Sequence, residues 1–189
     1  MKLLIGEQII KTCELLHRMG YVLGGTGNIS FCEGGHIYIT PTKRNKATLN
    51  TRDIAALTMD GSIIWGEPSS EYHAHVSIYN LNPRAKAVIH AHPPITTAMS
   101  RVEQFPEMGP SDKAHFLEQP AFIGYYEPGS AVLAQVVGEA SLISSIIIMK
   151  NHGIITWGTD LEVALLSIEA VEHYLQVHLY ERLIKLGKW

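Results

Sequence analysis

The segment Ala-Val-Ile-His-Ala-His-Pro, residues 87–93, joins an apolar run to two histidines and a proline. The apolar run predicts a buried β-strand over residues 87–90. Side chains at i and i+2 of a strand point to the same face, so we expect His90 and His92 to lie side by side where this strand ends. Two imidazoles in this arrangement can share one metal ion. The pair alone is also compatible with ordinary core or surface histidines.

Helical and strand patterns alternate on both sides of this segment. Apolar spacing predicts helices over residues 5–19, 68–81, 95–100 and 131–139, and a last helix of about 25 residues. Short apolar runs predict strands over residues 29–32, 37–39, 54–59, 63–65, 146–149 and 154–157, whereas residues 101–128 carry loop-like signals. The order predicts a single α/β domain over residues 1–189, with a sheet covered by helices.

Capping signals mark the start of two of these helices. Ser69 or Ser70 can cap the helix that begins near residue 70, and Thr159 with Glu162 matches a capping box for the last helix. The apolar face of that last helix is formed by Leu161, Leu165, Ile168, Val171, Leu175, Leu179 and Leu183.

Composition excludes several classes of protein. The chain has 189 residues, 46% of them hydrophobic, which is normal for a globular protein. A net charge of −3 argues against a basic nucleic-acid or lipid surface. We expect a cytoplasmic protein with no membrane contact, because there is no signal-peptide pattern and no apolar run of about 20 residues. Cys13 and Cys32 are then expected to be reduced thiols.

Ten histidines are an unusual feature of the composition. His152 lies in Asn151-His152-Gly153, a polar tripeptide between two predicted strands, which is typical of a tight turn. It can be a solvent-exposed turn residue. It can also be the third ligand beside His90 and His92, because three protein ligands with an open position form the pattern of catalytic zinc sites.

Glu71 follows two serines near the start of a predicted helix. The helix dipole stabilises an acid there, and this is the ordinary explanation. The functional alternatives are a general base, or a fourth metal ligand that substrate displaces. His73 and His75 fall on different faces of the helix, so they cannot both point at a metal. We interpret them as structural residues or as support for the metal ligands.

Three segments have the composition of anion-binding sites. Gly24, Gly25 and Gly27 can form a nest of backbone N–H groups, and the serines at 69 and 70 stand at a helix N-terminus. Residues 40–44 supply hydroxyls and positive charge. Each is weak alone, since glycine turns and solvated loops are common. Together with a metal site, they suggest a phosphorylated substrate.

Six motifs in order give the chain a specific resemblance. Their sequences are GTGNIS (25–30), ITPT (39–42), PSSE (68–71), HxxIY (75–79), AVIHAHP (87–93) and NHG (151–153). The chain resembles the class II aldolase/adducin family and is closest in pattern to the L-fuculose-1-phosphate aldolase branch. The resemblance implies a three-layer αβα domain with a central, mostly antiparallel sheet. It also implies a homo-oligomer, commonly a cyclic tetramer with active sites at subunit interfaces.

The resemblance also implies roles for individual residues. His90, His92 and His152 match the ligands of a divalent metal, usually Zn²⁺ or another transition metal. Glu71 matches the catalytic acid/base. The substrate phosphate is held by residues that match Asn28, Thr42, Ser69 and Ser70. The reaction implied is the cleavage of a small ketose 1-phosphate, such as L-fuculose 1-phosphate, to dihydroxyacetone phosphate and an aldehyde.

Other reactions on the same scaffold are alternatives. They are those of a methylthioribulose-1-phosphate dehydratase, a pentulose-phosphate 4-epimerase and a decarboxylase; a non-catalytic adducin-like module is a further one. Epimerases of the family usually carry aspartate at the position of Glu71. Two departures concern the aldolase reaction. Lys43 stands where the family often has glycine, and no tyrosine lies between Leu81 and Gly124, although aldolases of this branch use a tyrosine of the middle segment as an acid.

Overall fold

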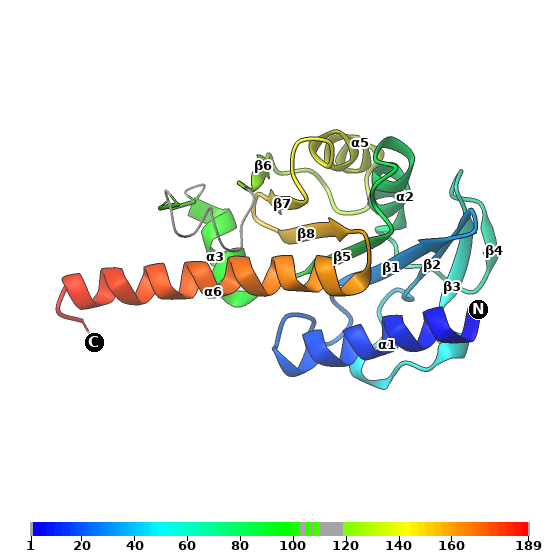
Figure 1. Ribbon diagram of the computed structural model, residues 1–189, viewed down its shortest axis with the longest axis horizontal. Coiled ribbons are helices and arrows are strands. Elements are labelled where there is room, and N and C mark those ends of the chain that lie inside the picture. Colours follow the sequence, from blue (N-terminus) through cyan, green and yellow to red (C-terminus); the bar gives the residue numbers. More distant parts are fainter. Residues whose placement is uncertain (1, 103–104, 107, 110–118, 189) are drawn as a thin grey trace.

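A central eight-stranded sheet organises the computed structural model, which describes residues 2–102, 105–106, 108–109 and 119–188 (Figure 1). The strand order is β4-β3-β2-β1-β5-β8-β7-β6, and every neighbouring pair is antiparallel except β6 and β7. The strands are β1 (Asn28–Glu33), β2 (His36–Ile39), β3 (Ala55–Thr58), β4 (Ile63–Trp65), β5 (Ala87–Ala91), β6 (Ala121–Ile123), β7 (Ile146–Met149) and β8 (Gly153–Gly158).

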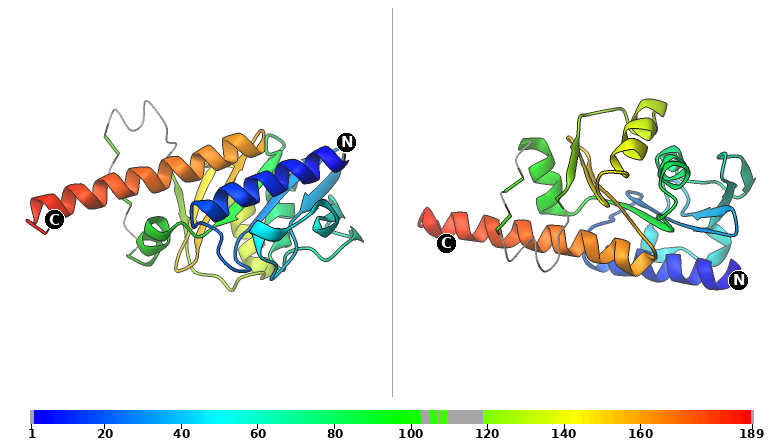
Figure 2. Two further views of the ribbon diagram at one scale, coloured as in Figure 1. Left: turned by 90° about the horizontal axis from the view of Figure 1, so that it is seen from below. Right: turned by 45° about the horizontal axis from the view of Figure 1, so that its top comes forward.

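Helices cover both faces of the sheet. They are α1 (Lys2–Arg18), α2 (Tyr72–Leu81), α3 (Pro94–Val102), α5 (Ala131–Ala140) and α6 (Leu161–Lys185), with two 3-10 turns at Lys46–Thr48 and Thr51–Asp53. Helices α1 and α6 lie on one face and α2 and α5 on the other, and the far half of α6 extends beyond the sheet (Figures 1 and 2). The predicted three-layer αβα architecture is confirmed.

The alternation of strand side chains divides the core into two halves. In β5, Ile89 packs into the cluster formed with α1 and α6, whereas its neighbour Val88 packs into the cluster formed with α2 and α5. Both residues are fully buried. A central strand covered on both faces has no polar side to expose, which explains why residues 87–89 form a continuous apolar run. This is the run that ends at the two histidines.

The predicted helix starts were wrong in two places. Asp160, not Thr159, caps α6, because its carboxylate accepts a hydrogen bond from the Val163 N–H at 2.8 Å. Neither Ser69 nor Ser70 caps α2. That helix begins at Tyr72, and the Ser69 hydroxyl accepts instead from the backbone N–H of Glu71 at 3.3 Å. Glu71 occupies the N-cap position without capping the helix, which leaves its carboxylate available.

Two other expectations needed correction. The loop-like stretch 101–128 contains β6, a three-residue strand that pairs in parallel with β7 and is too short to show a periodic pattern. The apolar face of α6 is buried only as far as Leu175, and Leu179 is 41% exposed. The C-terminal part of α6 extends beyond the sheet (Figure 1).

Two expectations drawn from composition can be compared with the structure. Cys13 and Cys32 are buried free thiols, and burial raises the pKa of Cys13 to about 12. No helix in the described part of the chain is both long and apolar enough to cross a membrane.

Candidate active site

Strand register brings the three histidines of the predicted metal site together. β5 lies between β1 and β8, with Asn28 opposite His90 on one side and Ile154 opposite Ala91 on the other. Because β5 and β8 are antiparallel, the turn that precedes β8 lies beside the end of β5. His152 is in that turn. It therefore reaches His90 and His92, although about 60 residues separate them along the chain.

The turn itself depends on two residues with special backbone requirements. Asn151 has φ of 57°, in the left-handed region that asparagine tolerates better than most residues. Gly153 follows directly. A Cβ there would lie 2.6 Å from the carbonyl oxygen of Ala91 and 2.8 Å from Cδ2 of His92. Only glycine therefore lets the turn approach β5 this closely, and the Asn-His-Gly sequence serves this geometry.

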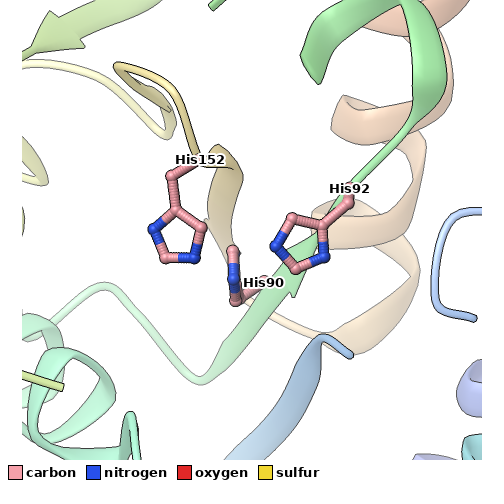
Figure 3. Close-up of side chains that lie close together, drawn as sticks. All are labelled: His90, His92 and His152. Atoms are coloured by element: carbon pink, nitrogen blue, oxygen red, sulfur yellow. The ribbon is translucent and has the colours of Figure 1, made fainter. Parts of the chain in front are cut away.

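The three imidazoles face a common point (Figure 3). Ring centroids lie 4.6 Å apart for His90 and His92, 4.7 Å for His90 and His152, and 5.4 Å for His92 and His152. One nitrogen of each ring lies within 4.8 Å of the corresponding nitrogens of the other two. This separation suits three ligands of one metal ion.

The donor set fits a divalent transition metal. His90 Nδ1 lies 2.9 Å from the Ile154 carbonyl oxygen, to which it can only donate, so Nε2 is left with its lone pair. Among the described residues, His90 Nε2, His92 Nδ1 and His152 Nδ1 are buried without a hydrogen-bond partner. Such atoms are costly unless something binds them. A metal ion held by neutral imidazoles would satisfy His90 Nε2, whose lone pair is free.

The protonation state of the rings also favours metal binding. Burial, together with the neighbouring imidazoles, lowers the pKa of His90 well below its usual range and that of His92 to about 3. Burial lowers the pKa of His152 as well. Metal ligands must be deprotonated, and these rings are neutral at pH 7.

Glu71 lies between two of the histidines. Its Oε2 is 3.5 Å from His90 Nε2, and its Oε1 is 3.4 Å from His152 Nε2. The side-chain amide of Asn28 donates a hydrogen bond to Oε2 at 2.9 Å. The carboxylate is mostly buried, with 18% of the side chain exposed. It is therefore placed to accept or deliver a proton beside the three histidines.

A pocket opens beside these residues and contains all four predicted phosphate contacts. Its wall includes the predicted residues Asn28, Thr42, Ser69, Ser70, Glu71, His92 and His152. The rest is formed by Gly25, Thr26, Gly27, Lys43 and Pro128. His90 is 2% exposed and is not among the residues that line this pocket. The predicted site residues, which come from five separate segments of the sequence, thus lie together in the fold.

Sequence reasoning missed one residue that shapes this wall. Lys46 is fully buried, and its ammonium donates to the carbonyl oxygens of Arg44 at 2.9 Å, Pro41 at 3.3 Å and Gly25 at 3.4 Å. It ties the glycine loop to the loop that carries Thr42. A lysine in a basic loop usually points into solvent, so the sequence carried no signal for this role.

The two histidines of α2 separate as predicted. His73 is exposed, whereas His75 is fully buried. His75 Nε2 lies 2.5 Å from Oδ1 of Asn28, the residue whose amide also contacts Glu71. The interpretation of His75 as a supporting residue thus agrees with its position. Its partner Asn28 could not be inferred from periodicity.

Comparison with known proteins identifies the family of the chain. Residues 7–179 match the class II aldolase and adducin N-terminal domain family. The chain belongs to this family. A protein of Methanocaldococcus jannaschii named L-fuculose phosphate aldolase is 36% identical over 179 residues, 95% of this chain and 98% of that protein.

Two further similarities bear on reaction and fold. A protein of Haemophilus influenzae named 3-oxo-tetronate 4-phosphate decarboxylase is 28% identical over 173 residues, 88% of this chain and 82% of that protein. The crystal structure of L-fuculose-1-phosphate aldolase from Thermus thermophilus matches with a TM-score of 0.86 at 24% identity. That match covers 96% of this chain and 95% of that one, and it concerns the fold. The chain is thus a member of the class II aldolase superfamily. The names of its relatives give two different reactions, the cleavage of a sugar phosphate and a decarboxylation.

Proposed function

We propose that the protein is a zinc-dependent aldolase that cleaves a small ketose 1-phosphate, such as L-fuculose 1-phosphate, to dihydroxyacetone phosphate and an aldehyde. The observation that carries the proposal is the group of three histidines with Glu71 between two of them, at the edge of a polar pocket. The 36% identical relative named L-fuculose phosphate aldolase supports the same reaction.

The residues divide the chemistry as follows. His90, His92 and His152 would hold the ion, which supplies Lewis-acid polarisation of substrate oxygens when bound. Asn28, Thr42, Ser69 and Ser70 line the pocket where the phosphate would lie. When the bond between C3 and C4 of the sugar breaks, the C4 hydroxyl releases its proton to solvent as it becomes the aldehyde carbonyl, the Glu71 carboxylate takes up a proton, and the electron pair stays on C3. Glu71 then delivers a proton to that carbon, and its position beside His90 and His152 suits this transfer.

A decarboxylase is the second candidate. The Haemophilus influenzae relative named for decarboxylation of a 3-oxo-tetronate 4-phosphate is 28% identical. Loss of carbon dioxide likewise leaves an electron pair beside a carbonyl group, so the same metal site and the same proton donor would serve. The position of Tyr125 also favours this alternative, because aldolases of the fuculose branch use a tyrosine as an acid. Tyr125 is 52% exposed, its hydroxyl donates to Glu127, and it is not part of the pocket wall.

We further propose a cytoplasmic homotetramer. The support is the resemblance to the family and a set of exposed apolar side chains on the far half of α6 and directly after it, namely Val177, Leu179, Tyr180, Ile184 and Leu186. A second copy of the chain would cover them. Light scattering of the purified protein at micromolar concentration measures this directly, and a monomer would contradict it.

Metal content and product analysis test the proposed reaction. We expect about one zinc ion per chain by elemental mass spectrometry, and loss of that zinc in His92→Ala, because three histidines form the site. His73→Ala is the matched control, since His73 is exposed on α2 and should leave the zinc in place. Zinc retained in His92→Ala would refute the site.

Products then separate the candidate reactions. The zinc-loaded protein is incubated with ketose 1-phosphates and with 3-oxo-tetronate 4-phosphates. Release of dihydroxyacetone phosphate supports the aldolase, whereas release of carbon dioxide supports the decarboxylase. Glu71→Gln should keep the zinc and lose activity by a factor of about 10² to 10⁴. Full activity in that variant would overturn the assignment of Glu71.

A further inference from the structure

We propose that His75 is a positioning residue, which holds Asn28 so that its amide fixes the carboxylate of Glu71. The inference rests on the proposed function in that it gives Glu71 its catalytic role. It starts from a buried chain of hydrogen bonds that no metal ligand belongs to. The chain runs from Tyr79 through Ser30 and His75 to Asn28 and ends at Glu71.

Every contact in this hydrogen-bond chain is within hydrogen-bond distance, and every group except Glu71 is buried. The Tyr79 hydroxyl lies 2.7 Å from Ser30 Oγ, which lies 2.6 Å from His75 Nδ1. His75 Nε2 lies 2.5 Å from Asn28 Oδ1, and Asn28 Nδ2 lies 2.9 Å from Glu71 Oε2. Ser30 and His75 are fully buried, Asn28 is 2% exposed and Tyr79 is 4% exposed. Water therefore cannot replace these partners, and each group constrains the next.

Glu71 determines which group donates and which accepts in each of these hydrogen bonds. A carboxylate only accepts, so the Asn28 amide must turn its NH₂ group toward Glu71 and its oxygen toward His75. His75 must then carry its proton on Nε2. The other nitrogen, Nδ1, accepts from the Ser30 hydroxyl, which in turn accepts from Tyr79. The histidine thus distinguishes the two orientations of the asparagine amide, and only one of them offers a donor to Glu71.

The fold brings the members of this hydrogen-bond chain together because the residue spacing on β1 matches the residue spacing on α2. Asn28 and Ser30 are two residues apart on β1 and point to the same face of the sheet. His75 and Tyr79 are four residues apart on α2 and therefore share one face of that helix. Neighbours on one face of a strand are about 6.6 Å apart, and neighbours one helical turn apart are about 6 Å apart. The two pairs therefore interlock.

Substitutions of His75 separate positioning from packing. His75→Leu fills the space but removes the donor, whereas the side-chain amide of His75→Gln can still donate to Asn28. We expect kcat to fall about 100-fold in His75→Leu, with KM changing less and zinc content unchanged. His75→Gln should recover most of that loss. Equal kcat values in the two variants, or loss of zinc in either, would overturn the proposal.

A milder pair of variants guards against misfolding. Ser30→Ala removes the hydroxyl that donates to His75, and we expect a drop in kcat of about tenfold. Ser141→Ala is the matched control, because Ser141 is also fully buried but donates to the Gly138 carbonyl instead. It should leave kcat unchanged at a similar loss in Tm. The same loss of kcat in both variants would show a general effect of stability.

The tautomer of His75 can be read without any substrate. Long-range ¹H–¹⁵N NMR spectra of the zinc-loaded protein should place the His75 proton on Nε2. A proton on Nδ1 would overturn the proposal whatever reaction the enzyme performs. If the proton is on Nε2 but wild type cleaves no sugar phosphate, the hydrogen-bond chain stands and the proposed function fails.

Discussion

At the scale of single residues, Lys43 combines backbone strain with a place in the pocket wall. Its φ of 51° lies in the left-handed region, which costs a residue with a Cβ about 1 to 2 kcal/mol. Other members of the family often have glycine at this position. A strained lysine beside Thr42 and Ser70 is explained if its ammonium binds the phosphate of the substrate.

Lys43→Gly should therefore change stability and affinity in opposite senses. We expect the free energy of unfolding to rise by about 1 kcal/mol, because glycine adopts this φ freely. KM for the phosphorylated substrate should rise about tenfold, since a charge-assisted hydrogen bond is lost. Urea unfolding and steady-state kinetics measure the two effects. Lys43→Ala is the control, because it loses affinity without relieving strain; an unchanged KM in both variants would exclude a contact with phosphate.

At the scale of elements, a buried carboxylate joins α3 to α6. Glu172 of α6 is 6% exposed and accepts hydrogen bonds from the backbone N–H of Ile95 at 2.9 Å, and from the N–H and hydroxyl of Thr96 at 2.8 Å each. These N–H groups begin α3 and have no partner within that helix. Since α3 starts two residues after His92, this contact also holds the end of β5.

Glu172→Gln should destabilise the fold by about 2 to 4 kcal/mol, because the amide NH₂ faces donors and leaves one of them unpaired. Urea unfolding of the zinc-free protein measures the loss. The matched control is Glu169→Gln, less than one turn earlier on the same helix and only partly buried, for which we expect a change below about 0.5 kcal/mol. Similar losses in the two variants would contradict the capping role of Glu172.

How far the sequence predicts these elements depends on the range of the interactions. Helices and strands with repeated apolar residues, such as those that became α6 and β5, were predictable because the pattern is local. The cap at Asp160 and the strand β6 were not, since one depends on competition between adjacent side chains and the other on a neighbouring strand. The histidines could be grouped by motif and resemblance, but the buried positions of Lys46 and Glu172 follow only from tertiary packing.

At the scale of the whole molecule, buried histidines couple stability to pH. Burial lowers the pKa of His75 from 6.5 to about 4, so the unfolded chain binds more protons than the native protein between these values. The contribution of His75 to the free energy of unfolding is fully present above pH 6.5 and is lost as the pH falls toward 4. For His75 alone the loss amounts to about 3 kcal/mol at pH 4.

We therefore expect the zinc-free protein to lose at least about 3 kcal/mol of unfolding free energy between pH 7 and pH 4. His90 and His92, whose pKa values are also lowered, add to the loss. Urea titrations across this range provide the measurement, and His75→Gln should show a shallower slope than wild type. The same slope in both proteins would mean that His75 does not contribute to the pH dependence of the free energy of unfolding.

The adjacency of β5 and β8 also sets a time at which the proposed metal site can form. As the chain leaves the ribosome, His90 and His92 emerge well before His152, and β8 follows His152 directly. A nascent chain that has not yet paired β8 with β5 offers an ion two ligands on an open strand edge. The proposed metal site is therefore complete only late in biogenesis, after β8 has paired with β5 and brought His152 to the other two histidines.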